Sequence, residues 1–291
     1  TDAQHKDGKN ARQVVRWLED KDYGNKPFFI ALGLQKPHVP FLAPDKYFDL
    51  YPFDKITYKT DRSNLWDFLP QSALSKRYEA FGFNFAKENH ALRKEYMQAY
   101  HACVSFIDAQ LGLVMDSLKK QGLWEDTVIV FTSDHGYHLG DHFIWGKVTL
   151  FDIGAKVPFI VRAPGLSKSG TTSEAMVELI DIYPTLADLA GLKAPIHLQG
   201  SSLRPLLGHP ERLGKKKYAY SVVTRGPKNL GYALRNQNWR YGKWPDGEEL
   251  YNLRSDPQEK NNLAQKDHLK QRLLEFRKIL AEKQENLENT K

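Results

Sequence analysis

Residues 127–158, TVIVFTSDHGYHLGDHFIWGKVTLFDIGAKVP, decide the fold. The stretch opens with 127–132, an apolar and β-branched run whose length is typical of a strand buried on both faces. The run stops at Ser133-Asp134-His135-Gly136, where the glycine permits a turn that a Cβ would obstruct. A carboxylate and an imidazole at the carboxyl end of such a strand occupy the position where open α/β sheets bind ligands.

The loop after this strand concentrates groups that bind ions. Asp134 and His135 can present an oxygen and a nitrogen to one divalent cation. Lys147, further along the same loop, can neutralise an anionic group bound on that cation. Each residue alone is equally typical of a turn or a protein surface. The cluster favours an active site, and the spacing does not name the metal.

Composition and charge narrow the function classes. The chain has 291 residues, 41% hydrophobic and 26% charged, which is typical of globular domains. The formal charge of +7 comes from Lys and Arg that are scattered among Asp and Glu, without a zinc-finger or RNA-binding signature. We therefore expect no nucleic-acid partner. A basic balance fits an anionic substrate, including a sulfated polysaccharide.

The sequence shows no recognisable targeting signal or membrane anchor. It starts at Thr1 and has no hydrophobic stretch long enough for a signal peptide or a membrane span. We expect a processed product or a fragment whose export signal lies elsewhere, and no membrane partner. A single cysteine, Cys103, excludes an internal disulfide and argues against a cysteine metal site.

Periodicity predicts the arrangement of the first part of the chain. Residues 92–121 have the longest amphipathic helical pattern, and residues 10–20 a shorter one. The apolar run 27–33 predicts a first strand, which a right-handed crossover through the long helix would set parallel to 127–132. Residues 157–162 predict a third buried strand. We expect an α/β fold with a mostly parallel central sheet.

The remaining segments complete the predicted organisation. The aromatic-rich stretch 43–90 reads as an insertion in the α/β part, which extends over 1–210. Pro37 and Pro40 are expected to keep the loop after 27–33 extended. We therefore expect His38 at the same sheet edge as Asp134. Short strands separated by turns, then a helix over 267–287, predict a C-terminal subdomain at 211–291 with a small antiparallel sheet. Helices are also expected at 181–191 and 200–207.

Three groups of motifs, in matching order along nearly the whole chain, resemble the sulfatases of the alkaline-phosphatase superfamily, and the iduronate-2-sulfatase type most closely. The first group is PFFIALGLQKPHVPF at 27–41. The second is TSDHG at 132–136 with LGDH at 139–142, WGK at 145–147 and VP at 157–158. The third is ELYNL at 249–253 with DP at 256–257 and NNL at 261–263. The resemblance implies an alkaline-phosphatase/sulfatase-like sandwich.

The resemblance also implies a mechanism and its residues. Such sulfatases attack the sulfate ester with a formylglycine whose hydrate sits on Ca²⁺. Asp134 and His135 correspond to the later pair of calcium ligands, although imidazole is a less usual partner for calcium than oxygen. Lys147 and His38 correspond to residues that contact sulfate oxygens, and either of them is a candidate to protonate the leaving alcohol.

The segment that carries the nucleophile is not in this sequence. Family members make formylglycine within Cys/Ser-x-Pro/Ala-x-Arg, whereas Cys103 is followed by Val-Ser-Phe-Ile. The chain therefore resembles the C-terminal two-thirds of a sulfatase. We expect an N-terminal segment of the same enzyme as a separate or nicked chain, because a sheet without its first strands would expose an apolar edge. The resemblance also suggests a periplasmic or secreted protein, and a homodimer is possible.

The substrate is predicted only by class. Six side chains are candidates for substrate binding, each with packing as the alternative: Lys36, Tyr137, His138, His142, Trp145 and Arg235. We expect a sulfuric ester hydrolase acting on a sulfated sugar that contains uronate, galactose or fucose, as in ulvan, carrageenan, fucoidan or a glycosaminoglycan. The alternatives are a phosphodiesterase or phosphonate hydrolase of the same superfamily, and a glycan-binding relic without catalysis.

Overall fold

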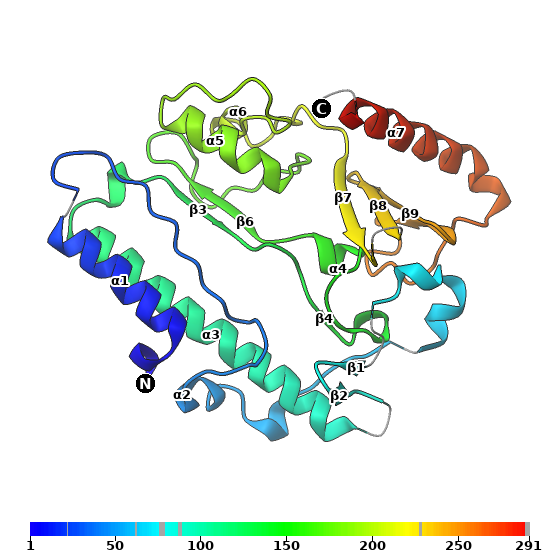
Figure 1. Cartoon of the computed structure of the whole chain (residues 1–291), viewed down its shortest axis with the longest axis horizontal. Coiled ribbons are helices and arrows are strands. Elements are labelled where there is room, and N and C mark those ends of the chain that lie inside the picture. The colour runs from blue at the N-terminus through cyan, green and yellow to red at the C-terminus, as the bar shows by residue number, and fades with distance from the viewer. Residues whose placement is uncertain (22, 62, 76–78, 87–88, 227–228, 289–291) are drawn as a thin grey trace. The chain divides into compact units, whose positions relative to one another are not determined.

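The structure is a computed structural model that describes residues 1–21, 23–61, 63–75, 79–86, 89–226 and 229–288 (Figure 1). Contacts divide the chain into two units. Unit 1 contains Thr1–Lys59 and Tyr78–Thr127, and unit 2 contains Thr60–Arg77 and Val128–Lys291. The division of the sequence into 1–210 and 211–291 stays a prediction.

Unit 1 is built on two helices that the periodic patterns predicted. α1 (Lys6–Asp20) and α3 (His90–Lys120) run side by side, and the short α2 (Asp45–Phe48) packs on α3 (Figure 1). Apolar side chains within these contacts are buried, as helical spacing requires: Ala11, Val14, Leu18, Tyr47, Ala102 and Phe106. Both long helices are confirmed. The unit also contains a hairpin of β1 (Glu79–Ala80) and β2 (Phe83–Asn84) and 3-10 helices at Asp2–Gln4, Phe53–Lys55 and Trp124–Asp126.

Residues 27–35 do not form the strand that the sequence predicted at 27–33. Their exposure alternates from residue to residue, as in extended chain, and the Phe29 side chain is 80% exposed. A strand is defined by its hydrogen-bond ladder with a neighbouring chain. Among the described residues of unit 1, no strand offers such a ladder to this segment. The predicted strand is therefore wrong in this structure, although the apolar run is extended.

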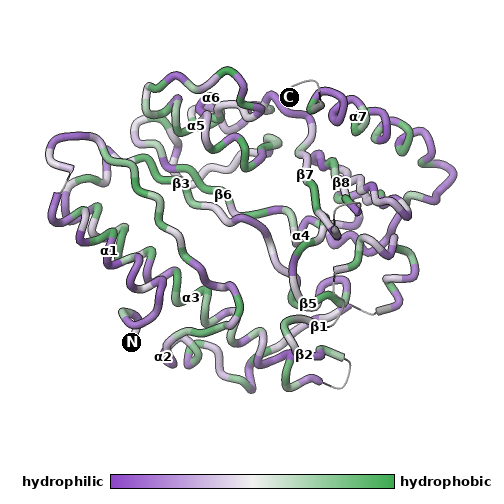
Figure 2. Tube along the Cα trace, viewed as in Figure 1, coloured by the Kyte–Doolittle hydropathy of each residue, from purple (hydrophilic) through white to green (hydrophobic). Residues whose placement is uncertain are grey.

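The organising strand of unit 2 is present, but its neighbour is not the one predicted. The sequence predicted 27–33 as a parallel neighbour. β3 (Ile129–Thr132) pairs antiparallel with β6 (Phe159–Arg162) in a two-stranded sheet. The only α-helix in the segment between them is the short α4 (Asp152–Ala155), which is not the crossover helix that parallel neighbours need. Ile160 is 61% exposed, so burial on both faces is also wrong for this pair. Figure 2 shows apolar residues along both strands.

The C-terminal sheet follows the prediction. Its four strands are antiparallel and neighbours in chain order: β7 (Ala219–Thr224), β8 (Leu230–Arg235), β9 (Trp239–Trp244) and β10 (Gly247–Asn252). α7 (Lys270–Glu288) covers one face, with alternating hydrophobic and hydrophilic residues (Figure 2). The core on this face is formed by Leu234, Tyr241, Leu250, Leu273, Phe276 and Leu280.

The opposite face of this sheet packs against the loop that follows β3. Ile144 and Phe151 cluster with Tyr251 and Leu253, and Leu150 clusters with Trp244. Within the loop, β4 (His138–Leu139) pairs antiparallel with β5 (Trp145–Gly146). The C-terminal sheet is thus the support on which the candidate site is built.

The other elements of unit 2 are short. α5 (Ile182–Leu189) and α6 (Arg204–Gly208) confirm the two helices predicted near 181–191 and 200–207. Short 3-10 helices lie at Ser63–Phe68, Gln71–Ala73, Asp141–Phe143, Leu179–Asp181 and Asp267–Leu269. Among the described residues, no helix combines the length and the apolar character needed to cross a membrane.

Candidate active site

The Asp134–Gly136 turn at the end of β3 is fixed by close backbone contact. The Gly136 N–H donates a 2.9 Å hydrogen bond to the Gly154 carbonyl. A Cβ on Gly136 would lie 2.0 Å from the Ile153 carbonyl oxygen. Only glycine permits this approach, so Gly136 of the sequence motif allows α4 to pack directly against the turn.

Asp134 and His135 form a donor pair that suits a cation. The Asp134 carboxylate is 83% exposed, and its Oδ1 accepts the His135 N–H at 3.0 Å. The His135 Nδ1 donates to the Gly136 carbonyl at 2.9 Å, which leaves Nε2 3.5 Å from Asp134 Oδ2. A backbone carbonyl commonly orients a metal-binding imidazole in this way. The pair therefore fits as two ligands of a cation. In the described part of the chain, no three His, Cys, Asp or Glu side chains gather into a complete metal site.

His138 is a buried residue with both ring nitrogens bonded. Nδ1 donates to the Asp141 carbonyl at 3.0 Å, and Nε2 accepts from the Thr149 hydroxyl at 2.7 Å. Burial lowers the pKa of His138 to about 3, and the neighbouring His142 acts in the same direction. The ring is therefore neutral at physiological pH and holds the loop together. Substrate contact by His138 stays a prediction, and it would require one of these hydrogen bonds to break.

His142 is also internal. Its side chain stacks on Phe151 with ring centroids 3.8 Å apart, and its backbone is left-handed with φ of 56°. The His142 N–H donates to Asp61 Oδ2 at 2.8 Å, and Nε2 donates to the Glu259 carbonyl at 3.0 Å. Burial lowers the pKa of this imidazole. Nearby Trp145 is buried as well, and the substrate roles of both residues stay predictions.

Lys147 follows β5 on a backbone held by a neighbouring segment. The Ser75 hydroxyl donates to the Lys147 carbonyl at 2.8 Å, and Val148 has a positive φ of 67°. The Lys147 side chain is partly exposed. Among the residues that the structure describes, none forms an ion pair with its ammonium group. A cation without a protein carboxylate is available to an anionic ligand.

Two further residues of unit 2 were predicted to bind substrate, and they differ in their contacts within the protein. Arg235 forms an ion pair with Asp152, with Nη2 and Nε 3.1 Å and 3.3 Å from Oδ2. This guanidinium holds the start of α4, so binding of a uronate or a second sulfate would compete with Asp152. Tyr137 lies between the Asp134–Gly136 turn and β4 and is partly buried. For both, substrate contact stays a prediction.

In unit 1, His38 lies in a loop that a buried carboxylate organises. Asp7, on α1, accepts the backbone N–H groups of Gln35 and Lys36, each at 2.8 Å. The Lys36 ammonium donates to the carbonyls of His38 and Pro40, at 3.1 Å and 2.5 Å. The exposed His38 ring donates from Nδ1 to the Val39 carbonyl at 2.7 Å, so Nε2 is not used in this contact. Lys36 thus stabilises the loop, and its predicted contact with substrate stays a prediction.

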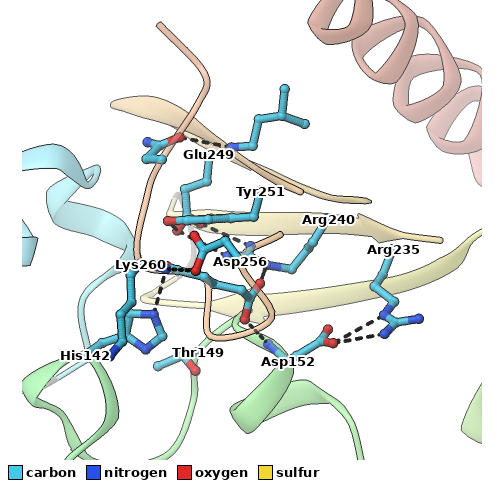
Figure 3. Close-up of polar contacts among 12 residues, drawn as sticks. His142, Thr149, Asp152, Arg235, Arg240, Glu249, Tyr251, Asp256 and Lys260 are labelled. Atoms are coloured by element: carbon cyan, nitrogen blue, oxygen red, sulfur yellow. Dashed lines mark hydrogen bonds and ion pairs between the residues drawn. The ribbon is translucent and has the colours of Figure 1, made fainter. Parts of the chain in front are cut away.

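Sequence reasoning missed a buried charge cluster behind the candidate site. Arg240 on β9, Glu249 on β10 and Glu259 after β10 are each at most 2% exposed. Arg240 forms an ion pair with Glu259 and a 3.4 Å pair with Glu249 (Figure 3). Burial raises the pKa of Glu259, which the Arg240 guanidinium opposes. The sequence signal that could have revealed this cluster is a charged residue at an inward-facing position of a strand, Arg240 on β9 and Glu249 on β10.

A glycine makes room for this cluster. Gly242 lies opposite Glu249 in the β9–β10 register. A Cβ at Gly242 would lie 2.7 Å from Glu249 Oε2 and 3.0 Å from Arg240 Nη1. The ion pairs are therefore accommodated by the missing side chain at this position.

Cys103 is not available as a nucleophile. The residue lies inside α3 and is fully buried. Burial raises the pKa of its thiol to about 11, so little thiolate forms at neutral pH.

Two family models match the chain. The model described as Sulfatase matches residues 2–192. The model described as N-sulphoglucosamine sulphohydrolase, C-terminal matches residues 140–286. Together they extend over both units.

Curated relatives and a solved structure agree with these matches. A sulfatase of Formosa agariphila is 36% identical, over 92% of this chain and 52% of that protein. Human iduronate 2-sulfatase is 29% identical, over 88% of this chain and 62% of that protein. A solved structure in complex with its substrate D-glucosamine-2-N,6-O-disulfate matches with a TM-score of 0.86 at 23% identity, over 98% of this chain and 70% of that one.

These matches settle two predictions. The resemblance to the sulfatases, including iduronate-2-sulfatase, is confirmed. The predicted fold class, α/β of the alkaline-phosphatase/sulfatase type with a small antiparallel C-terminal sheet, is confirmed by the structural match and by β7–β10. The chain spans between 52% and 62% of the length of these two curated relatives.

Proposed function

The chain belongs to the sulfatase family, and on this premise we propose that it forms part of a sulfuric ester hydrolase that removes sulfate from a sulfated polysaccharide or oligosaccharide. The chain spans 52% of the Formosa sulfatase, so the proposed activity is that of the whole enzyme. The observation that carries the proposal is the exposed Asp134–His135 pair at the end of β3. Lys147, an ammonium without an ion pair among the described residues, lies on the same loop.

Asp134 and His135 are proposed to hold one Ca²⁺ together with ligands from a preceding segment of the enzyme. Bound calcium supplies positive charge beside the sulfate group, which stabilises negative charge that develops during ester cleavage. Oxygen ligands suit calcium better than nitrogen, so Asp134 is expected to contribute more of the affinity. His135 keeps its ring orientation through the hydrogen bond to the Gly136 carbonyl.

Lys147 and His38 are proposed to contact the sulfate oxygens. The Lys147 ammonium would balance the charge of the sulfate group directly. The His38 Nδ1–H is engaged by the Val39 carbonyl, so Nε2 of the doubly protonated ring is the atom that would donate a proton to the departing sugar oxygen or a hydrogen bond to sulfate. Lys147 would act by binding and His38 by binding or by proton transfer, and neither is proposed as the nucleophile.

The nucleophile is proposed to be a formylglycine on an N-terminal segment of the same enzyme, present as a separate or nicked chain. Cys103, the single cysteine of this chain, is buried in α3 without the surrounding motif. The same segment would pair with the exposed edges of β3 and β6. The protein is proposed to act in the periplasm or outside the cell.

The substrate is proposed to be a sulfated uronate- or amino-sugar-containing glycan, as in glycosaminoglycans, with ulvan, carrageenan and fucoidan as further candidates. This choice draws on the names of relatives that act on iduronate sulfate and glucosamine sulfate. Lys36, Tyr137 and Arg235 are proposed to contact the sugar. His138, His142 and Trp145 would serve the site from inside the loop.

The test is release of inorganic sulfate by the full-length enzyme, after mass spectrometry has established that formylglycine is present. Sulfated disaccharides, a phosphate diester and a phosphonate monoester are assayed in parallel, before and after removal of calcium with a chelator. We expect sulfate release that stops on chelation and returns with calcium. Faster turnover of the phosphonate or phosphate ester would identify a phosphoesterase instead. Glycan binding without turnover by formylglycine-containing protein would identify a binding protein.

A further inference from the structure

One residue holds both ends of the segment that carries Lys147. The Glu259 carbonyl accepts the His142 Nε2–H at 3.0 Å. The Glu259 carboxylate accepts the Asp152 backbone N–H at 2.7 Å. His142 and Asp152 bound the segment 142–152, so main chain and side chain of a single glutamate fasten its beginning and its end. Figure 3 shows His142 and Arg240 beside the loop that also bears Asp256 and Lys260, and the Asp152 side chain directed toward Arg235.

Glu259 is itself held rigidly. Arg240 neutralises its carboxylate from β9, and the backbone of Glu259 is left-handed with φ of 55°. Asp256 closes the loop by accepting the N–H groups of Lys260 and Asn261, at 3.1 Å and 2.8 Å. A non-glycine residue in the left-handed region is held there only by surrounding contacts. The loop is thus anchored to the C-terminal sheet before it contacts the segment 142–152.

A second contact repeats the arrangement beside the first. Lys260 forms a 2.7 Å ion pair with Asp61, and Asp61 accepts the His142 backbone N–H at 2.8 Å. His142 therefore receives support from Glu259 directly and from Lys260 through Asp61. Consecutive residues of one loop fix the beginning of the segment by two routes.

The anchored segment leads on to both sets of candidate catalytic groups. Lys147 lies between its two ends. Beyond Asp152, the Gly154 carbonyl binds the Gly136 N–H at 2.9 Å and so fixes the Asp134–Gly136 turn. Inside the segment, Thr149 donates to His138 at 2.7 Å. Displacement of the 142–152 backbone would therefore move the Lys147 ammonium and the Asp134–His135 pair together.

We propose that Glu259 is a positioning residue of the enzyme, which sets Lys147 and the Asp134–His135 pair through the segment 142–152. This inference rests on the proposed function for its catalytic consequence. Glu259 touches neither substrate nor metal in this role. Its effect arises because small displacements of groups that contact the reacting atoms reduce the rate by about 100-fold.

The test compares Glu259→Asp and Glu259→Gln with a matched control in the full-length enzyme. Glu259→Asp keeps the negative charge beside Arg240 but shortens the reach to the Asp152 N–H. Glu259→Gln keeps an acceptor oxygen but removes the charge. The control is Glu248→Gln on β10, the strand that precedes the Glu259 loop, which removes a carboxylate paired with Arg277 on the side of α7. We measure kcat and KM for a sulfated disaccharide, thermal unfolding, and hydrogen exchange of residues 142–154.

We expect both Glu259 variants to lose at least about tenfold in kcat with a smaller change in KM, because the interactions displaced act mainly in the transition state. Hydrogen exchange should accelerate in residues 142–154 while β7–β10 stay protected. Glu248→Gln should keep its kcat and the exchange of 142–154. If Glu259→Gln does not fold, Glu259→Asp decides, since the charge beside Arg240 remains.

Three outcomes would overturn the proposal: unchanged kcat in a folded Glu259 variant, unchanged exchange of 142–154, or an equal loss of kcat in Glu248→Gln at equal loss of stability. If the wild-type enzyme releases no sulfate, the proposed function fails separately. Exchange of 142–154 then still shows whether Glu259 holds the segment, because that measurement does not depend on turnover.

Discussion

The Nε2 atom of His142 lies 3.0 Å from the carbonyl oxygen of Glu259, which is 117 residues further along the chain. This contact joins the loop after β3 to the loop after β10. Since His142 also stacks on Phe151, the imidazole is a structural group between two parts of unit 2. The C-terminal sheet is therefore part of the machinery that shapes the candidate site, and the following predictions test its components.

The stability of the protein should fall in mild acid because of His138. Its folded pKa is about 3 against an ordinary value of 6.5, so the unfolded state binds a proton that the folded state excludes. The stability that this neutral ring contributes is fully present above pH 6.5 and is lost as the pH falls from 6.5 toward 3. The expected loss from this residue is about 1.4 kcal/mol by about pH 5.5.

The measurement is the free energy of unfolding in denaturant at several pH values between about 8 and 5. His142, whose pKa burial also lowers, adds to the same slope. The variant His138→Gln carries no titrating ring, so its stability should depend less steeply on pH than that of the wild type. Equal slopes for both proteins would show that His138 is not buried as a neutral ring.

Gly136→Ala should destabilise the turn that carries Asp134 and His135. The added Cβ would lie 2.0 Å from the Ile153 carbonyl oxygen, so either the turn or α4 must move. Overpacking of this kind costs about 1–3 kcal/mol, and we expect weaker binding of Ca²⁺ as well. The measurements are chemical denaturation and calcium titration by calorimetry.

A second glycine supplies the control for this substitution. Gly112 lies within α3, where a Cβ would meet nothing within 4 Å. Gly112→Ala should raise stability by about 1 kcal/mol, because alanine has the higher helix propensity. If Gly136→Ala is as stable as the wild type, the close contact with Ile153 is absent in solution.

Cys103 should be unreactive in the folded protein. The thiol is fully buried and its pKa is about 11, so a thiol reagent at about pH 8 finds roughly one molecule in a thousand as thiolate. We expect modification only in denaturant, and sulfate release by Cys103→Ala enzyme at the wild-type rate. Rapid labelling of the native protein, or a mass at Cys103 that corresponds to formylglycine, would contradict both the burial and the proposed position of the nucleophile.

The sequence predicted local elements well where a periodic pattern extends over several turns or strands. α3 was evident because one apolar stripe runs its whole length, and β7–β10 because turn residues separate short runs. Strand pairing was not predictable in the same way. The run at 27–33 and β3 have similar composition, but pairing depends on which segment supplies a neighbour, and that information is not local.

The sequence predicted the part of the candidate site whose charged side chains lie in one loop. It missed the residues that support this loop, because they are far apart in the chain. Asp134, His135 and Lys147 stand in one loop and could be read together. Glu259 and Asp7 look like ordinary surface charges in sequence, since charged residues are usually solvated. Their burial becomes visible only when the fold places Arg240 against Glu259 and the Asp7 carboxylate against the backbone of Gln35 and Lys36.

Lys147→Ala should reduce turnover more than any other substitution of a lysine on this loop. The ammonium has no ion pair among the described residues, so its removal leaves no protein carboxylate unpaired and should change the free energy of unfolding by less than about 0.5 kcal/mol. Loss of a charge that faces the transferring group should lower kcat/KM by about 100- to 1000-fold, comparable to removal of other groups that stabilise developing charge. Lys147→Arg should recover part of this loss, because the charge remains but the guanidinium is wider.

The matched control is Lys156→Ala, which removes an exposed lysine just after α4 and changes the net charge equally. If Lys156→Ala loses as much activity as Lys147→Ala, the effect is long-range attraction of an anionic substrate rather than contact with sulfate. That distinction can be checked by salt, since long-range attraction weakens with ionic strength whereas a contact inside the site is screened much less.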